Sequence, residues 1–231
     1  MIVPWMPKAK IAKAAAGVIS VYQSIVCKRV EPPIPVEDII ERGLNLHLRY
    51  SNLREKLKLD DVLGATYVDR KVICVDESLL KGRSDGRLCF TFAHEVGHWI
   101  LHRKFVDEKR RKGSDEAFIF CRVKDAKLPV EWQADYFASC LLMPEKSVKN
   151  AFSKCYGSTP LTLYNIKSAF SGPICFDPCV ENWPRIAAKV KEAGCFSNVS
   201  KQAVIIRLQD LGLVRNETRA RMSWAESYVI S

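Results

Sequence analysis

The sequence has no long hydrophobic run. No uninterrupted apolar stretch among its 231 residues approaches the ~20 residues that a membrane-spanning helix requires, so we expect a soluble protein without membrane contact. It also has no internal repeat and no low-complexity tract. Its length and 48% apolar content argue against disorder and allow one sizeable core, or a core with a small second unit.

The cysteines do not follow the dense pattern of a secreted disulfide scaffold. Nine of them, an odd number, are spread from Cys27 to Cys195 through apolar segments. A reducing compartment fits this usage, and we expect a cytoplasmic protein. In Lys8–Cys27, lysines precede an apolar segment as they do in a signal peptide, but we interpret this segment as an amphipathic helix.

Charge says little about the binding partner. A net charge of +10 and a pI of about 9.2 favour an anionic partner such as nucleic acid, yet bulk charge identifies no ligand. The basic run at residues 109–112 lies among acidic residues, and we expect it in a solvated loop.

Proline and glycine divide the first half of the chain into short elements. A proline-rich joint in residues 31–40 leads into a helix from Val36. Alternating apolar residues predict a strand in residues 44–50 and two more in residues 65–77, on either side of a turn at Asp69.

Longer helices are expected further on. Apolar spacing predicts a buried helix over residues 87–105, capped near Ser84 or Asp85, and a second over residues 130–143 between two prolines. A charged excursion and the strand-like residues 117–123 separate them.

The region after the second helix has a different residue pattern. It begins with a loop-rich connection and ends in two helical patterns, at residues 183–193 and 200–211. We therefore divide the chain into three parts: an N-terminal helix at 1–30, a central domain at 31–150 and a mostly helical region at 151–231.

Three of the four histidines lie in "FTFAHEVGHWILH", residues 90–102. Residues four apart share one face of a helix, so His94 and His98 can offer two nitrogens to one zinc ion. Glu95 lies beside them and can take a proton from the attacking water. Without a metal, several imidazoles would be buried among aromatic side chains and would need polar partners, which makes that interpretation unfavourable.

A catalytic zinc ion has three protein ligands and one open position. Glu131 and Asp135, in "EWQAD", share a helix face, so that one carboxylate could bind the metal while the other orients a histidine. His102 is a rival ligand, but a helix rises about 6 Å per four residues, so three stacked histidines rarely converge on one ion. We favour for His102 a place in the cleft wall, in support of a ligand or in packing, and for His47 a structural role.

Four motifs in order resemble the ImmA/IrrE family of zinc metallopeptidases, also called the IrrE N-terminal-like domain. They are "IPVEDII", "ATYVDRKVICVDESLL", "FTFAHEVGHWILH" and "EWQADYFASCLLMP", and they extend from about Pro35 to Pro144. The resemblance implies an α+β fold, a minimal gluzincin-like zincin in which a small twisted sheet packs on two ligand-bearing helices. The helical patterns add a small C-terminal unit.

The resemblance also implies a site and an activity. His94, His98 and Glu131 would bind Zn²⁺, Glu95 would be the general base, and Asp135 would support the ligands where many relatives carry asparagine. Family members of known activity cleave helix-turn-helix repressors of phage or mobile-element type and so release stress-response or excision genes. The insertion at 103–128 and the long C-terminal part depart from shorter members, so the identity of the substrate does not carry over.

Zincin architecture suggests how a peptide would bind. We expect an edge strand of the 66–76 hairpin to hold the substrate extended by main-chain pairing. Four side chains are chemically able to stabilise the oxyanion. They are Tyr67, Tyr136, Arg87 and His102.

The C-terminal region leaves alternatives open. Residues 198–218, with a cap at Ser200, resemble the second helix of a helix-turn-helix or winged-helix unit, in which Lys201, Gln202 and Arg207 could meet DNA. An ordinary packed helix or a docking surface for the substrate protein explains the same residues. The alternative function is a zincin-fold regulatory module that binds DNA or a repressor without cleaving it. A secreted hydrolase would require removal of the N-terminal helix.

Overall fold

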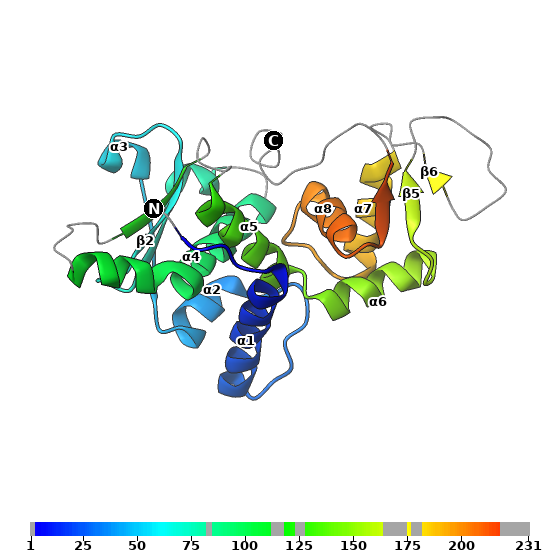
Figure 1. Cartoon of the computed structure of the whole chain (residues 1–231), viewed down its shortest axis with the longest axis horizontal. Coiled ribbons are helices and arrows are strands. Elements are labelled where there is room, and N and C mark those ends of the chain that lie inside the picture. The colour runs from blue at the N-terminus through cyan, green and yellow to red at the C-terminus, as the bar shows by residue number, and fades with distance from the viewer. Residues whose placement is uncertain are drawn as a thin grey trace. The chain divides into compact units, whose positions relative to one another are not determined.

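A computed structural model describes the chain except for seven segments, at residues 1–2, 82–84, 112–117, 123–127, 164–174, 177–181 and 218–231. Its elements are drawn in Figure 1. The chain forms two compact units. The first comprises Met1–Val30 and Ile34–Leu142, and the second comprises Glu31–Pro33 and Met143–Ser231. In the described ranges, no helix combines the length and hydropathy that crossing a membrane would require.

The first unit contains a four-stranded sheet in the order β1-β3-β2-β4. Its strands are β1 (His47–Ser51), β2 (Val62–Tyr67), β3 (Val72–Asp76) and β4 (Phe118–Arg122). β1 runs parallel to β3, whereas β2 is antiparallel to both β3 and β4. The two strands expected on either side of the turn, and the strand expected in the insertion, are confirmed.

The hairpin formed by β2 and β3 does not lie at an edge of this sheet, so the expectation that it offers a free edge is wrong. β1 covers the outer side of β3, and β4 covers the outer side of β2. The hairpin sequence contains no information about these two partners, which come from distant segments. Among the described strands, the edges of the sheet are β1 and β4.

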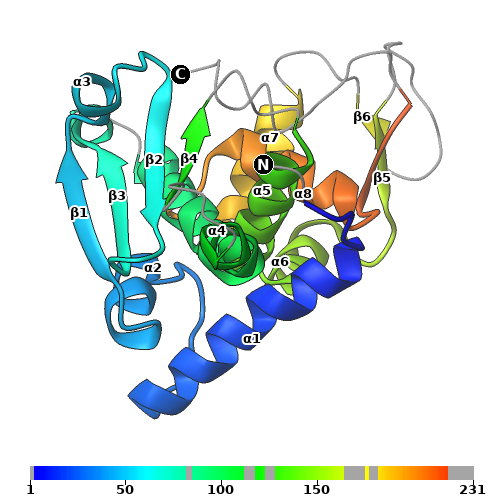
Figure 2. The same ribbon diagram turned by 60° about the vertical axis from the view of Figure 1, so that its left-hand side comes forward.

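Two long helices stand beside the sheet. α4 (Asp85–Arg111) packs against the sheet, and α5 (Pro129–Leu142) packs against α4 (Figure 2). α4 continues past residue 105, so Lys109, Arg110 and Arg111 are helical and the expected loop is wrong there; residue 112 lies outside the described residues. The α+β class, with a small sheet beside the two helices that carry the candidate ligands, is confirmed.

The two helices approach closely because α4 has a glycine at their crossing. A Cβ atom on Gly97 would lie only 3.1 Å from the backbone of Ala134. This approach brings the first turn of α5 up to the histidines of α4. Nearly every residue of α5 is buried as a result.

The N-terminal segment also belongs to the first unit. α1 (Lys8–Val26) buries one face, which confirms the amphipathic helix, and this helix packs on α5. The buried residues are Ile11, Ala15, Val18 and Tyr22. Four short elements complete the unit: α2 (Val36–Asp38), the π-helix η1 (Ile39–Gly43), α3 (Leu53–Leu57) and the 3₁₀-helix η2 (Glu77–Leu80).

The second unit combines three helices with a small sheet. The helices are α6 (Glu145–Tyr156), α7 (Asn182–Ala193) and α8 (Lys201–Asp210). The strands β5 (Leu161–Leu163), β6 (Cys175–Phe176) and β7 (Val214–Asn216) form a parallel sheet in the order β6-β5-β7. α7 and α8 confirm the two helical patterns. α6, which the sequence patterns do not predict, contains residue 150, the expected end of the central domain.

The N-terminus of α8 is capped as expected, since the Ser200 hydroxyl accepts a hydrogen bond from the Ala203 amide at 3.0 Å. Arg207, in contrast, does not face outward. It is 2% exposed, donates from Nε to the Met143 carbonyl at 3.3 Å, and pairs with Asp210 at 3.1 Å. The interpretation of Arg207 as a DNA contact is therefore wrong, because this side chain holds the second unit together.

Candidate metal centre

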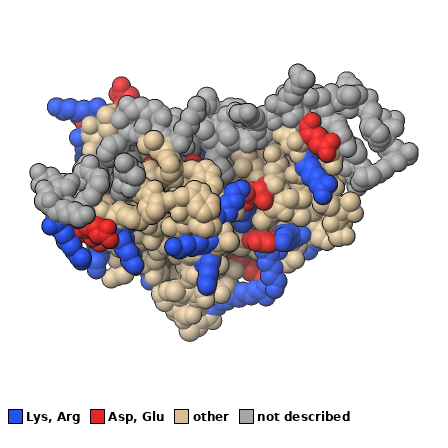
Figure 3. All heavy atoms as spheres, in the orientation of Figure 1, with Lys and Arg blue, Asp and Glu red and all other residues tan. Residues whose placement is uncertain are grey.

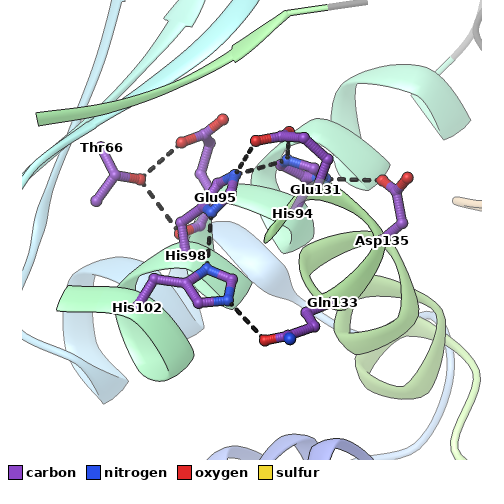
Figure 4. Close-up of polar contacts among 8 residues, drawn as sticks. All are labelled: Thr66, His94, Glu95, His98, His102, Glu131, Gln133 and Asp135. Atoms are coloured by element: carbon purple, nitrogen blue, oxygen red, sulfur yellow. Dashed lines mark hydrogen bonds and ion pairs between the residues drawn. The ribbon is translucent and has the colours of Figure 1, made fainter. Parts of the chain in front are cut away.

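Two histidines of α4 and one glutamate of α5 meet in the interior of the first unit (Figure 4). His94 Nε2 lies 2.9 Å from His98 Nε2 and 3.1 Å from Glu131 Oε2. His98 Nε2 lies 3.6 Å from the other oxygen of Glu131. One ligand atom from each residue lies within 4.8 Å of the other two. The helix spacing of four and the close crossing at Gly97 together produce this convergence.

The chemistry of this set fits a metal ion. His94 Nδ1 lies 2.8 Å from Asp135 Oδ1, and since a carboxylate accepts, His94 donates from Nδ1 and keeps a lone pair on Nε2. That lone pair points at a second imidazole nitrogen and a carboxylate, all buried. Such atoms repel one another unless they share a cation. Two imidazole nitrogens and one carboxylate oxygen form a donor set that zinc accepts.

Glu131 is suited to bind as an anion. Burial by itself raises the pKa of its carboxyl, but positive charge on His98 and the hydrogen bonds that protonated rings of both histidines would donate outweigh burial and hold that pKa well below its usual range. A bound metal cation would replace these protons and act in the same direction. The carboxylate form is thus favoured next to the two rings.

Glu95 occupies a separate niche between α4 and β2. Its side chain is fully buried, and Thr66 on β2 donates a hydrogen bond from Oγ1 to Glu95 Oε2 at 2.6 Å. The other oxygen, Oε1, is buried without a hydrogen-bond partner. Gly64 makes the room, because a Cβ there would lie 2.3 Å from Oε1. Burial raises the pKa of Glu95, although the charges of His98 and His94 oppose this shift.

His102 does not join the three converging residues. Its Nδ1 lies 3.0 Å from His98 Nδ1, and its Nε2 lies 3.0 Å from Gln133 Oε1. Burial lowers the pKa of His102 to about 3, with the charge of His98 acting in the same direction. Both ring nitrogens are engaged and the ring is fully buried, so His102 is not available as an oxyanion donor.

Some contributing residues were missed at the level of sequence. Thr66 and Gly64 lie on β2, about thirty positions from Glu95, and their role depends on how the sheet packs against α4. The sequence contains one indication that Gln133 belongs to the site, since it lies between Glu131 and Asp135 on the same buried helix. His47 is exposed on β1, outside the site.

A histidine pair one helical turn apart, an adjacent buried glutamate and a carboxylate from a second helix form a zincin-like arrangement that could hold a metal ion. Residues 47–159 match the model of the metallopeptidase family Peptidase_M78, described as the IrrE N-terminal-like domain, and this part of the chain belongs to that family. The match covers the four-stranded sheet, α4 and α5, and so contains the whole candidate site. Among curated proteins, none matches the chain.

Proposed function

We propose that the protein is a zinc-dependent endopeptidase that acts in the cytoplasm on a protein regulator, with a helix-turn-helix repressor of phage type as substrate. The observation that carries this proposal is the convergence of His94, His98 and Glu131 beside a buried glutamate that has one unpaired oxygen. The family match supports peptidase chemistry. The repressor substrate rests on the family resemblance alone.

In the proposed reaction, His94, His98 and Glu131 hold the zinc ion. When bound, zinc supplies Lewis acidity that polarises the scissile carbonyl and makes water a stronger acid. Glu95 takes the proton from the attacking water on Oε1 and later delivers it to the leaving amine. Thr66 occupies Oε2, so that only Oε1 is free for this transfer. Asp135 keeps the His94 lone pair on Nε2.

We propose that the substrate forms main-chain hydrogen bonds with a different strand from the one expected. Since β2 and β3 are interior strands, the extended peptide would pair with the outer edge of β4. β4 lies next to β2, which carries Thr66 and Gly64, so a peptide added there would run along the side of the sheet that borders Glu95. The oxyanion would then be stabilised by Tyr67, Tyr136 or Arg87.

Binding without cleavage is the competing function. On the face shown in Figure 3, lysine and arginine side chains are interspersed with acidic ones rather than gathered into one patch. With Arg207 buried, α8 offers Lys201 and Gln202 as polar side chains near its start. Neither observation favours DNA over a protein substrate, and we retain the peptidase.

The test is Glu95→Gln. This change removes the proton acceptor but no ligand, so we expect zinc binding to persist while cleavage of the repressor encoded beside the gene falls by about 10²- to 10⁴-fold. Cleavage would be followed by electrophoresis and zinc by its stoichiometry after dialysis. The unchanged protein should give a single cut that a chelator blocks.

Glu145→Gln is the matched control, because Glu145 lies on α6 in an exposed pair with Lys149, and this variant should cleave normally. If Glu95→Gln retains full biological activity, the hydrolytic function is wrong and the binding module replaces it.

A further inference from the structure

A line of hydrogen bonds, buried except at its Pro4 end, runs from the segment before α1 to the candidate metal centre. Gln133 Nε2 donates to the Pro4 carbonyl at 2.9 Å. Gln133 Oε1 lies 3.0 Å from His102 Nε2, and His102 Nδ1 lies 3.0 Å from His98 Nδ1. Gln133, His102 and His98 are each at most 1% exposed. Four residues from three separate parts of the chain thus connect end to end (Figure 4 shows the last three).

The hydrogen bond to Pro4 determines which atom donates and which accepts in every other bond of this line. The Pro4 carbonyl can only accept, so the amide nitrogen of Gln133 must face it and Oε1 must face His102. His102 therefore donates from Nε2. In the neutral ring, Nδ1 is then an acceptor, and His98 must donate to it from its own Nδ1. This leaves the lone pair of His98 on Nε2, which points at His94 and Glu131.

We propose that Gln133 and His102 are positioning residues that hold His98 in its metal-binding tautomer, with Pro4 setting the direction of the line. The proposal rests on the proposed zinc site. His94 reaches the same tautomer by a shorter route, through the Asp135 carboxylate. α5 thus supplies the acceptor that sets the tautomer of each histidine, directly for one and through a second imidazole for the other.

Pro4 matters because the oxygen and nitrogen ends of the Gln133 side-chain amide have nearly the same shape. A glutamine that has lost its Pro4 contact can turn over and offer Nε2 to His102. His102 would then accept on Nε2 and donate from Nδ1, and His98 would have to accept on Nδ1 and carry its proton on Nε2. That proton would face Glu131 in place of the metal. The segment Val3–Pro7 is therefore linked to zinc affinity although it contains no ligand.

The first test compares two changes at His102. Asn places Oδ1 where the histidine has Nδ1, so His102→Asn keeps an acceptor for His98, whereas His102→Leu removes it. We expect His102→Leu to weaken zinc binding by about 10- to 100-fold and His102→Asn to bind close to the unchanged protein. Affinity is measured by competition with a chromophoric chelator. Equal affinities for the two variants would overturn the proposal, since a purely structural role predicts no rescue.

The second test replaces the amide that starts the line. In Gln133→Glu, the neutral carboxylic acid can donate from its hydroxyl to the Pro4 carbonyl and accept from His102 Nε2 on its other oxygen, so the tautomer of His98 is kept. In Gln133→Leu that acceptor is lost, and we expect a zinc affinity as weak as in His102→Leu. Similar affinities for Gln133→Glu and Gln133→Leu would contradict the proposed direction of the line.

A direct readout needs no metal. Nitrogen-15 NMR of the full-length, metal-free protein reports which nitrogen of His98 carries the proton. We expect Nδ1 in the unchanged protein, His102→Asn and Gln133→Glu, and a mixture in the two leucine variants. An unprotonated Nδ1 on His98 of the unchanged protein would overturn the inference, even if a leucine variant fails to fold. If the unchanged protein shows the expected tautomer but binds no zinc, the proposed function fails instead.

Discussion

At the scale of single residues, Glu95 shows how the site depends on side chains that carry no catalytic signature. Thr66 fixes one of its oxygens, and the missing side chain of Gly64 makes room for the other. The sequence predicts Glu95 because the histidine motif defines its place. It does not predict Thr66 or Gly64, since a contact across 29 positions is decided by how β2 packs on α4.

Gly64→Ala tests this arrangement. The new Cβ would lie 2.3 Å from Oε1 and 2.8 Å from the carboxyl carbon, so the carboxylate must move and lose its bond to Thr66. A displacement of about 1 Å at a catalytic group costs about 100-fold in rate, and we expect that loss in kcat with zinc affinity unchanged. Steady-state cleavage and chelator competition measure the two.

Gly17→Ala is the control for this change, because nothing lies within 4 Å of a Cβ at Gly17 on α1. It should leave cleavage unchanged. Normal cleavage by Gly64→Ala would show that Glu95 needs no fixed position.

At the scale of elements, local pattern predicts which segments are strands and helices but not how they are ordered. The alternation in residues 44–50 indicates a strand, and β1 lies there in part. Its parallel pairing with β3 depends on the path of the chain between them, which includes α3 and β2. The same limit explains why the hairpin was placed at an edge.

A single carboxylate joins β3 to two short helices. Asp76, 2% exposed at the end of β3, accepts hydrogen bonds from the Leu53 amide at 2.9 Å and the Ser78 amide at 3.1 Å. Burial raises its pKa, but the hydrogen bonds from Ser78, Leu53 and Arg54 together outweigh burial and lower it. The ionised form is therefore the one that stabilises the fold.

Asp76→Asn should reduce the free energy of unfolding by about 1.5–3 kcal/mol at neutral pH, because bonds to a charged acceptor are replaced by weaker ones. The folded pKa lies below the unfolded one, so the contribution of Asp76 is complete above about pH 4 and is lost as pH falls through the folded pKa. Denaturant titrations from pH 3 to pH 7 should show the two proteins converging in acid.

Asp69→Asn serves as the reference for this comparison, since Asp69 forms only a long surface pair with Arg70 at 3.8 Å. Asp69→Asn should change the free energy of unfolding by no more than about 0.5 kcal/mol at every pH. If the difference in unfolding free energy between Asp76→Asn and the unchanged protein does not depend on pH, the charge of Asp76 is not the cause of its stabilising effect.

At the scale of the whole molecule, the candidate metal centre lies entirely within the first of the two units. A ligand that binds only the folded state stabilises the part that binds it. Zinc at about 100 times its dissociation constant adds about 2.7 kcal/mol, and we expect this gain in α4 and α5 but not in α7 and α8. Hydrogen exchange of the full chain, with and without zinc, measures the protection of the backbone amides in each helix.

Magnesium should give no such protection, because it prefers oxygen ligands and retains its waters. Equal protection of α7 and α8 by zinc would show that the ion acts beyond the first unit.

α5 carries one proposed ligand and the acceptors that orient both histidines, Glu131, Gln133 and Asp135. If this helix separated from α4, a bound ion would lose its carboxylate ligand and the two imidazoles would lose their fixed tautomers at the same time. Partial assembly is therefore disfavoured, and capture of the metal becomes a cooperative event that reports whether α5 is in place. The proposed peptidase could then be silenced by loosening one helix, without altering any atom that touches the substrate.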